Sequence, residues 1–245
     1  ISFNDFFKMR GPGTRERMLC FEKSAPALAA LAASKAMTAA NVSGEDIGHL
    51  VSVSCTGFTA PGFDIALIKS LGLSPSISRT HVGFMGCHGV FNALRVASAL
   101  CKDEPGQDAL IASVELCSLH FRQGGNPRQM LSNALFSDGA AAAVVSSRKY
   151  SSNNWRITAQ GSFIIPESED AIMWRVGDQG FEMTLSSKVR QFIKVFLGPW
   201  IKEWLATQGF KINEIQSWAI HPGGPGVLDS VQKSLNLPKE ALATS

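Results

Sequence analysis

Residues 82 to 95 read Val-Gly-Phe-Met-Gly-Cys-His-Gly-Val-Phe-Asn-Ala-Leu-Arg. An apolar run ends at Met85, and apolar residues beyond Cys87 recur at helical spacing, which predicts a strand, a sharp turn and a helix. Gly86 and Gly89 flank the turn, where a side chain would obstruct a tight bend or the close approach of a ligand. The thiol would lie over the helix N-terminus, whose free N–H groups and dipole favour a thiolate. We interpret Cys87 as a nucleophile, with an ordinary buried cysteine as the alternative.

A candidate base lies far along the chain. Residues 217 to 226 read Ser-Trp-Ala-Ile-His-Pro-Gly-Gly-Pro-Gly, a short apolar run that ends in a turn before a helix-compatible segment at 227–235. His221 is therefore expected at the end of a strand. Two strand ends at equivalent edges of a sheet can bring a Cys and a His together, as Cys–His nucleophilic catalysis requires. The alternative is a His that only caps or shapes the turn.

Strands and helices alternate along the sequence, which predicts an α/β fold. The expected helices cover residues 24–40 (with Ser24 as the cap), 63–71, 88–101, 188–206 and 225–235. The expected strands cover residues 49–54, 77–85, 109–114, 140–146, 155–165 and 217–220. A polar, basic stretch at 147–154 is interpreted as the seam between two halves, residues 1–148 with Cys87 and residues 149–245 with His221.

The composition is that of an ordinary globular enzyme. Of the 245 residues, 45% are apolar and 18% are charged, and the net charge of +3 is too small to favour nucleic-acid binding. The apolar helix expected near residues 27–40 is too short to span a membrane. The five cysteines are odd in number and lack metal-type spacing, so we expect reduced thiols in a cytoplasm rather than disulfides or zinc: Cys20, Cys55, Cys87, Cys101 and Cys117.

Three segments carry a resemblance to a known family. Gly-Phe-Met-Gly-Cys-His-Gly at 83–89, Leu-Phe-Ser-Asp-Gly-Ala-Ala-Ala at 135–142 and Trp-Ala-Ile-His-Pro-Gly-Gly-Pro at 218–225 occur in the order and approximate spacing of the type III polyketide synthases. These are the chalcone-synthase-like branch of the thiolase superfamily. The resemblance implies two similar α/β halves in a layered αβαβα thiolase fold, and a homodimer. It is strongest for bacterial alkylpyrone and alkylresorcinol synthases.

The same resemblance implies a Cys–His–Asn triad. Cys87 and His221 match its first two members, whereas the family's Asn lies in a segment that would follow residue 245. We therefore read the chain as a fragment, truncated at both ends, and expect it to be impaired in steps that need the Asn. The implied substrates are an acyl-CoA starter, loaded on Cys87, and malonyl-CoA, which extends it by decarboxylation to a short polyketide that cyclises. No cofactor or metal is implied.

Further positions match the family's substrate-binding residues. Phe136 and Phe181 match two gatekeepers between the CoA tunnel and the cavity, with core aromatics as the alternative for both. His120 matches a cavity-lining position, with a surface histidine or a satisfied core histidine as the alternative. The small side chains at Thr56, Ala60 and Cys117 match positions that open a tunnel for a long acyl tail. Ile172 falls where chalcone synthases have a glycine, which would shrink the cyclisation pocket. The resemblance thus predicts a fatty starter and a short, pyrone-like or resorcinol-like product.

Two other functions stay open. A β-ketoacyl-ACP synthase III has the same fold and triad, but that family usually shows His-Gln-Ala-Asn where this chain has His221-Pro222-Gly223-Gly224. A non-catalytic acyl-binding pseudo-enzyme would account for a missing Asn, although the presence of both Cys87 and His221 argues against it.

Overall fold

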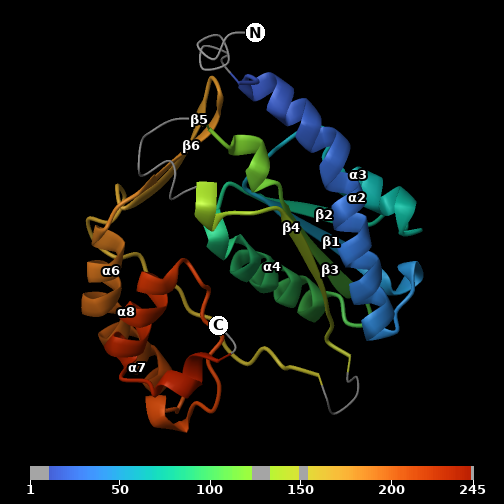
Figure 1. Ribbon diagram of the computed structural model, residues 1–245. Helices are drawn as coiled ribbons and strands as arrows, with labels where there is room; N and C mark the ends of the chain where they lie inside the picture. The colour runs from blue at the N-terminus through green and yellow to red at the C-terminus, as the bar shows by residue number, and fades with distance from the viewer. Residues whose placement is uncertain (1–10, 123–132, 149–153, 244–245) are drawn as a thin grey trace, which may run out of the picture. The chain divides into compact units, whose positions relative to one another are not determined.

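The computed structural model describes residues 11–122, 133–148 and 154–243 (Figure 1). The chain divides into two compact units. Unit 1 comprises Ile1–Gly124, Phe136–Ile157 and Val176–Phe181, and unit 2 comprises Gly125–Leu135, Thr158–Arg175 and Glu182–Ser245. In the described ranges, no helix has both the length and the apolar character that crossing a membrane requires.

Unit 1 is built on a four-stranded sheet in the order β2-β1-β3-β4. Its strands are β1 (Ile47–Ser54), β2 (Ser78–Gly83), β3 (Asp108–Glu115) and β4 (Gly139–Val145). The central strand β1 runs parallel to both β2 and β3, whereas β4 is antiparallel to β3. In this register Val51 lies opposite Thr80 on one side and Ile111 on the other. The carboxyl ends of β1, β2 and β3 therefore meet at one edge of the sheet.

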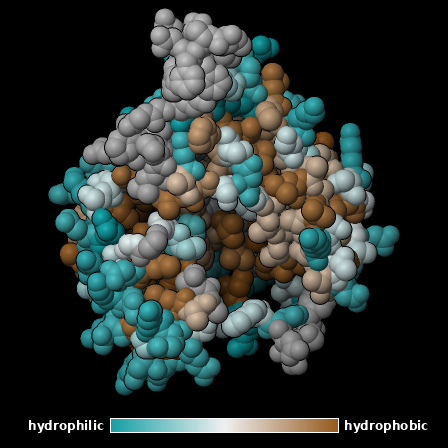
Figure 2. Space-filling view, in the orientation of Figure 1, coloured by the Kyte–Doolittle hydropathy of each residue, from teal (hydrophilic) through white to brown (hydrophobic). Residues whose placement is uncertain are grey.

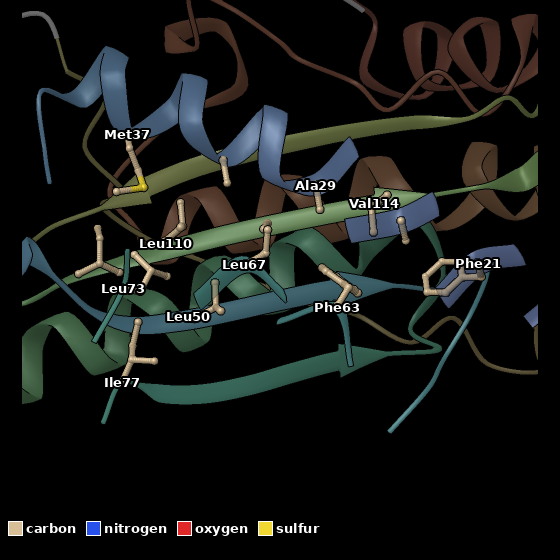
Figure 3. Close-up of a cluster of buried hydrophobic side chains, with 14 of the residues drawn as sticks. Phe21, Ala29, Met37, Leu50, Phe63, Leu67, Leu73, Ile77, Leu110 and Val114 are labelled. Carbon is tan, nitrogen blue, oxygen red and sulfur yellow. The ribbon is translucent and has the colours of Figure 1, made fainter. Parts of the chain in front are cut away.

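Helices cover both faces of this sheet. The helices α2 (Thr14–Ala40) and α3 (Phe63–Ser70) pack on one face, and α4 (Gly89–Asp103) packs on the other. Side chains alternate along the strands, so Leu50 joins the α2 and α3 cluster and Val51 joins the α4 cluster. Figure 3 shows the first cluster, in which Met37 and Ala29 of α2 lie over the strands.

The helix α2 is longer than expected. It begins at Thr14 rather than at a cap on Ser24, and Pro26 lies inside it. A buried side chain recurs every fourth residue along its whole length, at Arg17, Phe21, Ala25, Ala29, Ala33 and Met37. Because residues four apart lie on one helix face, the stripe continues past both Ser24 and Pro26 and holds the first turns against the sheet. The expected start at residue 24 is wrong for that reason.

Unit 2 consists mainly of helices. The helices α6 (Lys188–Phe192) and α7 (Gly198–Thr207) are joined by a π-helical turn (Ile193–Leu197), and α8 (Pro225–Leu235) follows. The single helix expected at 188–206 is thus helical throughout but changes its hydrogen bonding just before Pro199, which has no N–H to donate to the preceding turn. The surface over α7, at the lower left of Figure 2, is mostly hydrophilic.

Short 3₁₀ turns complete the described elements. They span Gly44–Asp46, Gly86–His88, Cys117–His120, Ile212–Glu214 and Lys239–Leu242. A hairpin formed by β5 (Ile172–Gly177) and β6 (Gly180–Leu185) was not expected from the sequence. Its tip, Val176–Phe181, belongs to unit 1, where the backbone N–H of Thr14 donates to Asp178 O at 2.9 Å.

Two expected strands do not form. Residues 155–165 and 217–220 belong to no strand in the part of the chain that the structure describes. Trp155 is 96% exposed and Ile164 is 85% exposed, so much of the apolar side of the first segment faces solvent. An apolar extended run becomes a strand only when a neighbouring backbone pairs with it, and the alternation of side chains cannot supply that neighbour.

Leu110 on β3 offers a test of this core, because it is fully buried in the cluster beneath α2. Leu110→Ala should lower the free energy of unfolding by about 2–5 kcal/mol, since it removes buried methyl groups and leaves a cavity. Leu31→Ala on α2 is the control, because Leu31 is 55% exposed. Urea denaturation followed by circular dichroism measures both changes. Equal effects of the two substitutions would contradict the packing described.

Candidate active site

The turn that carries Cys87 has the predicted order of a strand, a turn and a helix. The strand β2 ends at Gly83, a 3₁₀ turn covers Gly86–His88, and α4 begins at Gly89. Phe84 and Gly86 have positive φ angles of 55° and 65°, so the chain reverses sharply before Cys87. A Cβ on Gly89 would lie 3.0 Å from Val53 Cγ1, which shows how closely the start of α4 packs on β1. The structure thus confirms the local geometry expected around Cys87.

The parallel pairing of β1 with β2 and β3 gathers several candidate residues at one edge. Thr56 follows β1, Cys87 follows β2, and Cys117 follows Glu115 at the end of β3. The hydroxyl of Thr56 donates to Glu115 Oε2 at 2.6 Å and accepts from the N–H of Leu116 at 2.8 Å. The ends of β1 and β3, which are distant in sequence, are thereby tied together.

Electrostatics within unit 1 disfavour ionised thiols. Cys87 is exposed, yet partial burial and then the charge of Glu115 raise its pKa above the ordinary value. The same two causes, with Asp138 and Cys87 adding to them, raise the pKa of Cys117 to about 12. The helix N-terminus was expected to favour a thiolate at Cys87, but this influence is outweighed. Within unit 1, therefore, Cys87 is a thiol at neutral pH.

His120 and Phe181 form a buried pair. The backbone N–H of Phe181 donates to His120 Nδ1 at 2.9 Å, so His120 Nε2 carries the proton and donates to Thr56 O at 2.6 Å. Burial lowers the pKa of His120, in keeping with this neutral ring. The rings of His120 and Phe181 stack at 4.2 Å, and Phe84 of the nucleophile turn meets Phe181 edge-on at 5.5 Å. Both residues therefore link the hairpin tip to the strand ends.

Phe136 lies just before β4 and is half-buried. Asp138 holds this segment, because its carboxylate accepts from the N–H of Ser118 at 2.8 Å and from the Ser118 hydroxyl at 2.7 Å. Since Ser118 follows Cys117, the predicted gatekeeper Phe136 and the predicted tunnel residue Cys117 belong to adjoining segments of unit 1.

Ala60 lines a cavity of about 540 Å³ in unit 1. Its walls include Phe21, Phe58, Pro61, Phe63 and His81. The ring of Phe58 stacks on Phe181 at 5.9 Å, so this cavity adjoins the aromatic cluster beside the nucleophile turn. A larger hollow of about 1050 Å³ lies in unit 2 between Phe210, Trp218 and Leu237, and none of its lining residues was a predicted site residue.

His221 and Ile172 belong to unit 2. His221 is exposed and precedes α8, where its carbonyl accepts from the N–H of Gly223 at 2.9 Å. It follows a segment without regular secondary structure rather than the expected strand. Ile172 begins β5 and is 53% exposed. The meeting of His221 with Cys87 stays a prediction, as do the substrate-binding roles. Within the ranges described, no cluster of His, Cys, Asp and Glu could hold a metal ion.

The chain matches two descriptions of one known protein family. The family description "Chalcone and stilbene synthases, N-terminal domain" matches residues 7–149, and "Chalcone and stilbene synthases, C-terminal domain" matches residues 156–245. The chain belongs to the chalcone and stilbene synthase family. The resemblance to type III polyketide synthases, inferred from three motifs, is confirmed.

Individual members of the family are similar over nearly the whole chain. "Alpha-pyrone synthesis polyketide synthase-like Pks18" of Mycobacterium tuberculosis is 34% identical over 98% of this chain and 62% of its own length. The "1,3,6,8-tetrahydroxynaphthalene synthase" of Streptomyces peucetius is 34% identical over 89% of this chain and 59% of its own length. The chain thus spans about three fifths of the length of these relatives.

Solved structures confirm the expected α/β thiolase-like fold of this family. PKS-I from the brown alga Ectocarpus siliculosus superposes with a TM-score of 0.90 at 33% identity, over 96% of this chain and 62% of that one. The tetrahydroxynaphthalene synthase of Streptomyces coelicolor gives a TM-score of 0.89 at 30% identity, over 96% of this chain and 67% of that one.

Glu115 also belongs to this site, although its role was not predicted from the sequence. The cue in the sequence was a carboxylate at the carboxyl end of a mostly apolar, mostly buried strand, where an unpaired charge is costly. Its partners, however, come from a segment about sixty positions earlier in the chain. Only the register of β1 and β3 reveals them.

The raised pKa of Cys117 predicts low reactivity. With a pKa of about 12, about one Cys117 thiol in ten thousand is ionised at pH 8, and only the thiolate reacts with iodoacetamide. Cys117 should therefore stay unlabelled in the native chain while Cys20, exposed on α2, is labelled. Peptide mass spectrometry measures both, and labelling in guanidinium shows that each peptide can be detected. Equal native labelling would contradict the arrangement around Cys117.

Proposed function

We propose that this chain carries the acyl-loading site of a type III polyketide synthase, an acyltransferase that condenses an acyl-CoA starter with malonyl-CoA. The observation that supports this most strongly is the strand–turn–helix at Cys87 in a chain of the chalcone and stilbene synthase family. The turn exposes the thiol at the edge where three parallel strands end. A thiol in that position can reach a thioester that approaches from outside.

In the first step, the proton of Cys87 Sγ passes to the imidazole of His221. The thiolate attacks the carbonyl carbon of the acyl-CoA thioester, and the bond between that carbon and the CoA sulfur breaks. The leaving CoA sulfur takes the proton back from His221, so the acyl group ends on Cys87 and CoA leaves as its thiol. The backbone N–H of Cys87 can donate to the oxyanion that develops.

In the second step, malonyl-CoA loses carbon dioxide to give an enolate. The enolate carbon attacks the acyl carbonyl on Cys87, the carbon–sulfur bond breaks, and Cys87 is released as a thiolate. Negative charge builds on the thioester oxygen of malonyl-CoA when carbon dioxide leaves. In this proposal, His221 stabilises that charge. Repetition gives a short poly-β-keto chain that cyclises.

A long-chain starter is the favoured substrate in this proposal. Ala60 lines the 540 Å³ cavity, and a bulkier side chain there would occupy part of it. Each methylene buried in such a cavity contributes about 0.8 kcal/mol, so an open cavity selects long tails. Ile172 narrows the cyclisation pocket, which favours a short pyrone or resorcinol product. The relative named for alpha-pyrone synthesis supports the choice of a pyrone product.

The family assignment also bears on the alternatives and partners. It favours free CoA thioesters over the acyl carrier protein that a β-ketoacyl-ACP synthase III would use. We include in the proposal a homodimer, a cytoplasmic location, and two thiolase halves divided near residues 148 and 149. The non-catalytic reading makes a different prediction for the experiment below, because an acyl-binding protein forms no thioester.

Acyl loading tests the function. The chain is incubated with palmitoyl-CoA or acetyl-CoA, its intact mass is measured, and any adduct is mapped by peptide mass spectrometry. A palmitoyl thioester on Cys87, with little acetyl adduct, is the expected result. Cys87→Ala should abolish the adduct and Cys20→Ala should leave it unchanged. An adduct that persists in Cys87→Ala would refute the assignment of the nucleophile, and a folded chain without any adduct would favour the non-catalytic reading.

The same assay tests the starter. Ala60→Phe should reduce palmitoyl loading about tenfold or more, since displacing even two methylenes costs about 1.6 kcal/mol. Hexanoyl loading should fall much less, because a short acyl tail does not reach the part of the cavity that the Phe side chain fills. Ala60→Ser is the matched control, with a side chain small enough to leave the cavity open. An equal loss of palmitoyl and hexanoyl loading in Ala60→Phe would contradict the binding of the acyl tail in this cavity.

A further inference from the structure

The carboxylate of Glu115 is bound by a run of three residues. It accepts from the backbone N–H of Cys55 at 2.9 Å (Oε1) and 3.1 Å (Oε2), and from the hydroxyl of Thr56 at 2.6 Å. The hydroxyl of Ser54 lies 3.4 Å from Oε2. Among the described residues, no Lys or Arg forms an ion pair with Glu115. Burial raises the pKa of Glu115, while the hydrogen bonds from Thr56 and Cys55 oppose this by favouring the carboxylate. A carboxylate held only by neutral donors keeps its field on its surroundings.

Cys55 connects this carboxylate to the nucleophile turn. Its Sγ accepts from the N–H of Gly86 at 3.1 Å and lies 3.6 Å from Gly86 O. Gly86 has the positive φ angle that sets the direction of the chain into Cys87. A continuous path of hydrogen bonds therefore runs from Glu115 through Cys55 to the residue next to the nucleophile.

The charge of Glu115 acts on three thiols. It raises the pKa of Cys55, Cys87 and Cys117, in each case after the effect of burial. Other titratable groups nearby are Asp138, which faces Cys117, and His88, which follows Cys87 in the turn. His120 is neutral, and Arg17 faces it rather than the thiols. The charge that unit 1 presents to Cys87 is thus negative.

We propose that Glu115 is a positioning and charge-setting residue for the nucleophile, which holds the Ser54–Thr56 turn against Gly86 and makes the ionisation of Cys87 depend on a cationic partner from outside unit 1. The inference rests on the proposed function, in which that partner is His221. The proton moves between Cys87 Sγ and the imidazole, and Glu115 neither gains nor loses one. In this proposal the Cys87 thiol ionises where His221 supplies the compensating positive charge.

The pH profile of Cys87 alkylation tests the charge. Rates of iodoacetamide labelling at Cys87 are measured from pH 6 to 10 in the unchanged chain, in Glu115→Gln and in Glu22→Gln. Glu115→Gln keeps an acceptor for the Cys55 N–H but removes the charge, so the profile should shift to lower pH. The rate at pH 7 should rise about threefold or more. Glu22→Gln, on the exposed side of α2, should change nothing. An unshifted profile in Glu115→Gln would overturn the inference.

Glu115→Asp separates position from charge. It keeps the charge on a side chain that is one methylene shorter, so the profile should stay near that of the unchanged chain. Hydrogen exchange at the amides of Cys55 and Gly86 should become faster, because the shorter side chain no longer reaches the turn. If circular dichroism shows that Glu115→Gln does not fold, the aspartate variant decides. Unchanged protection of both amides would then overturn the positioning role.

These outcomes are distinct from those of the acyl-loading experiment, because alkylation needs no acyl-CoA. An acyl adduct on another residue would refute the proposed function and leave the alkylation profiles standing. An acyl adduct on Cys87 together with an unshifted Glu115→Gln profile would refute only the role of Glu115.

Discussion

The parallel pairing of β1 with both β2 and β3 is the constraint on which the site depends. Parallel strands end at the same edge, so the turn at Cys55 and Thr56, the turn at Cys87 and the carboxylate of Glu115 come together although the chain separates them widely. Helices on both faces bury the apolar sides of these strands and fix their register. A one-residue slip of β3 against β1 would turn Glu115 to the other face of the sheet, toward a helix. A one-residue slip of β2 against β1 would separate Cys55 from Gly86.

The local part of this arrangement could be predicted from the sequence. The apolar run, the two glycines and the helical spacing around Cys87 all act within fifteen residues, and the structure has the predicted strand, turn and helix there. The predicted start of α2 was wrong. Ser24 and Pro26 are local signals for a helix start, whereas the buried residue at every fourth position, including Phe21, reflects packing against the sheet. The family could be recognised because its motifs surround such local turns.

Contacts between distant segments could not be predicted in that way. The bonds from Glu115 to Cys55 and Thr56 depend on strand register, and those of His120 depend on the hairpin tip at Phe181, which had not been expected. The apolar run at 155–165 has the composition of a strand but no described pairing partner. The pKa of Cys87 shows the same difference between local and distant effects. The field of the α4 N-terminus could be predicted from the local sequence, whereas the opposing charge of Glu115 comes from a distant segment and could not.

Unit 1 therefore supplies the Cys87 nucleophile in its protonated, unreactive form, and we propose that His221 activates it. The most direct test is the pH at which Cys87 becomes half-ionised, measured from its alkylation rate in the unchanged chain and in His221→Gln. Loss of the positive charge that we propose His221 supplies would disfavour the thiolate, so we predict a midpoint at higher pH in His221→Gln, with no change in Gln216→Ala as a control. Identical midpoints in the unchanged chain and in His221→Gln would contradict the Cys87–His221 pair on which the proposed chemistry rests.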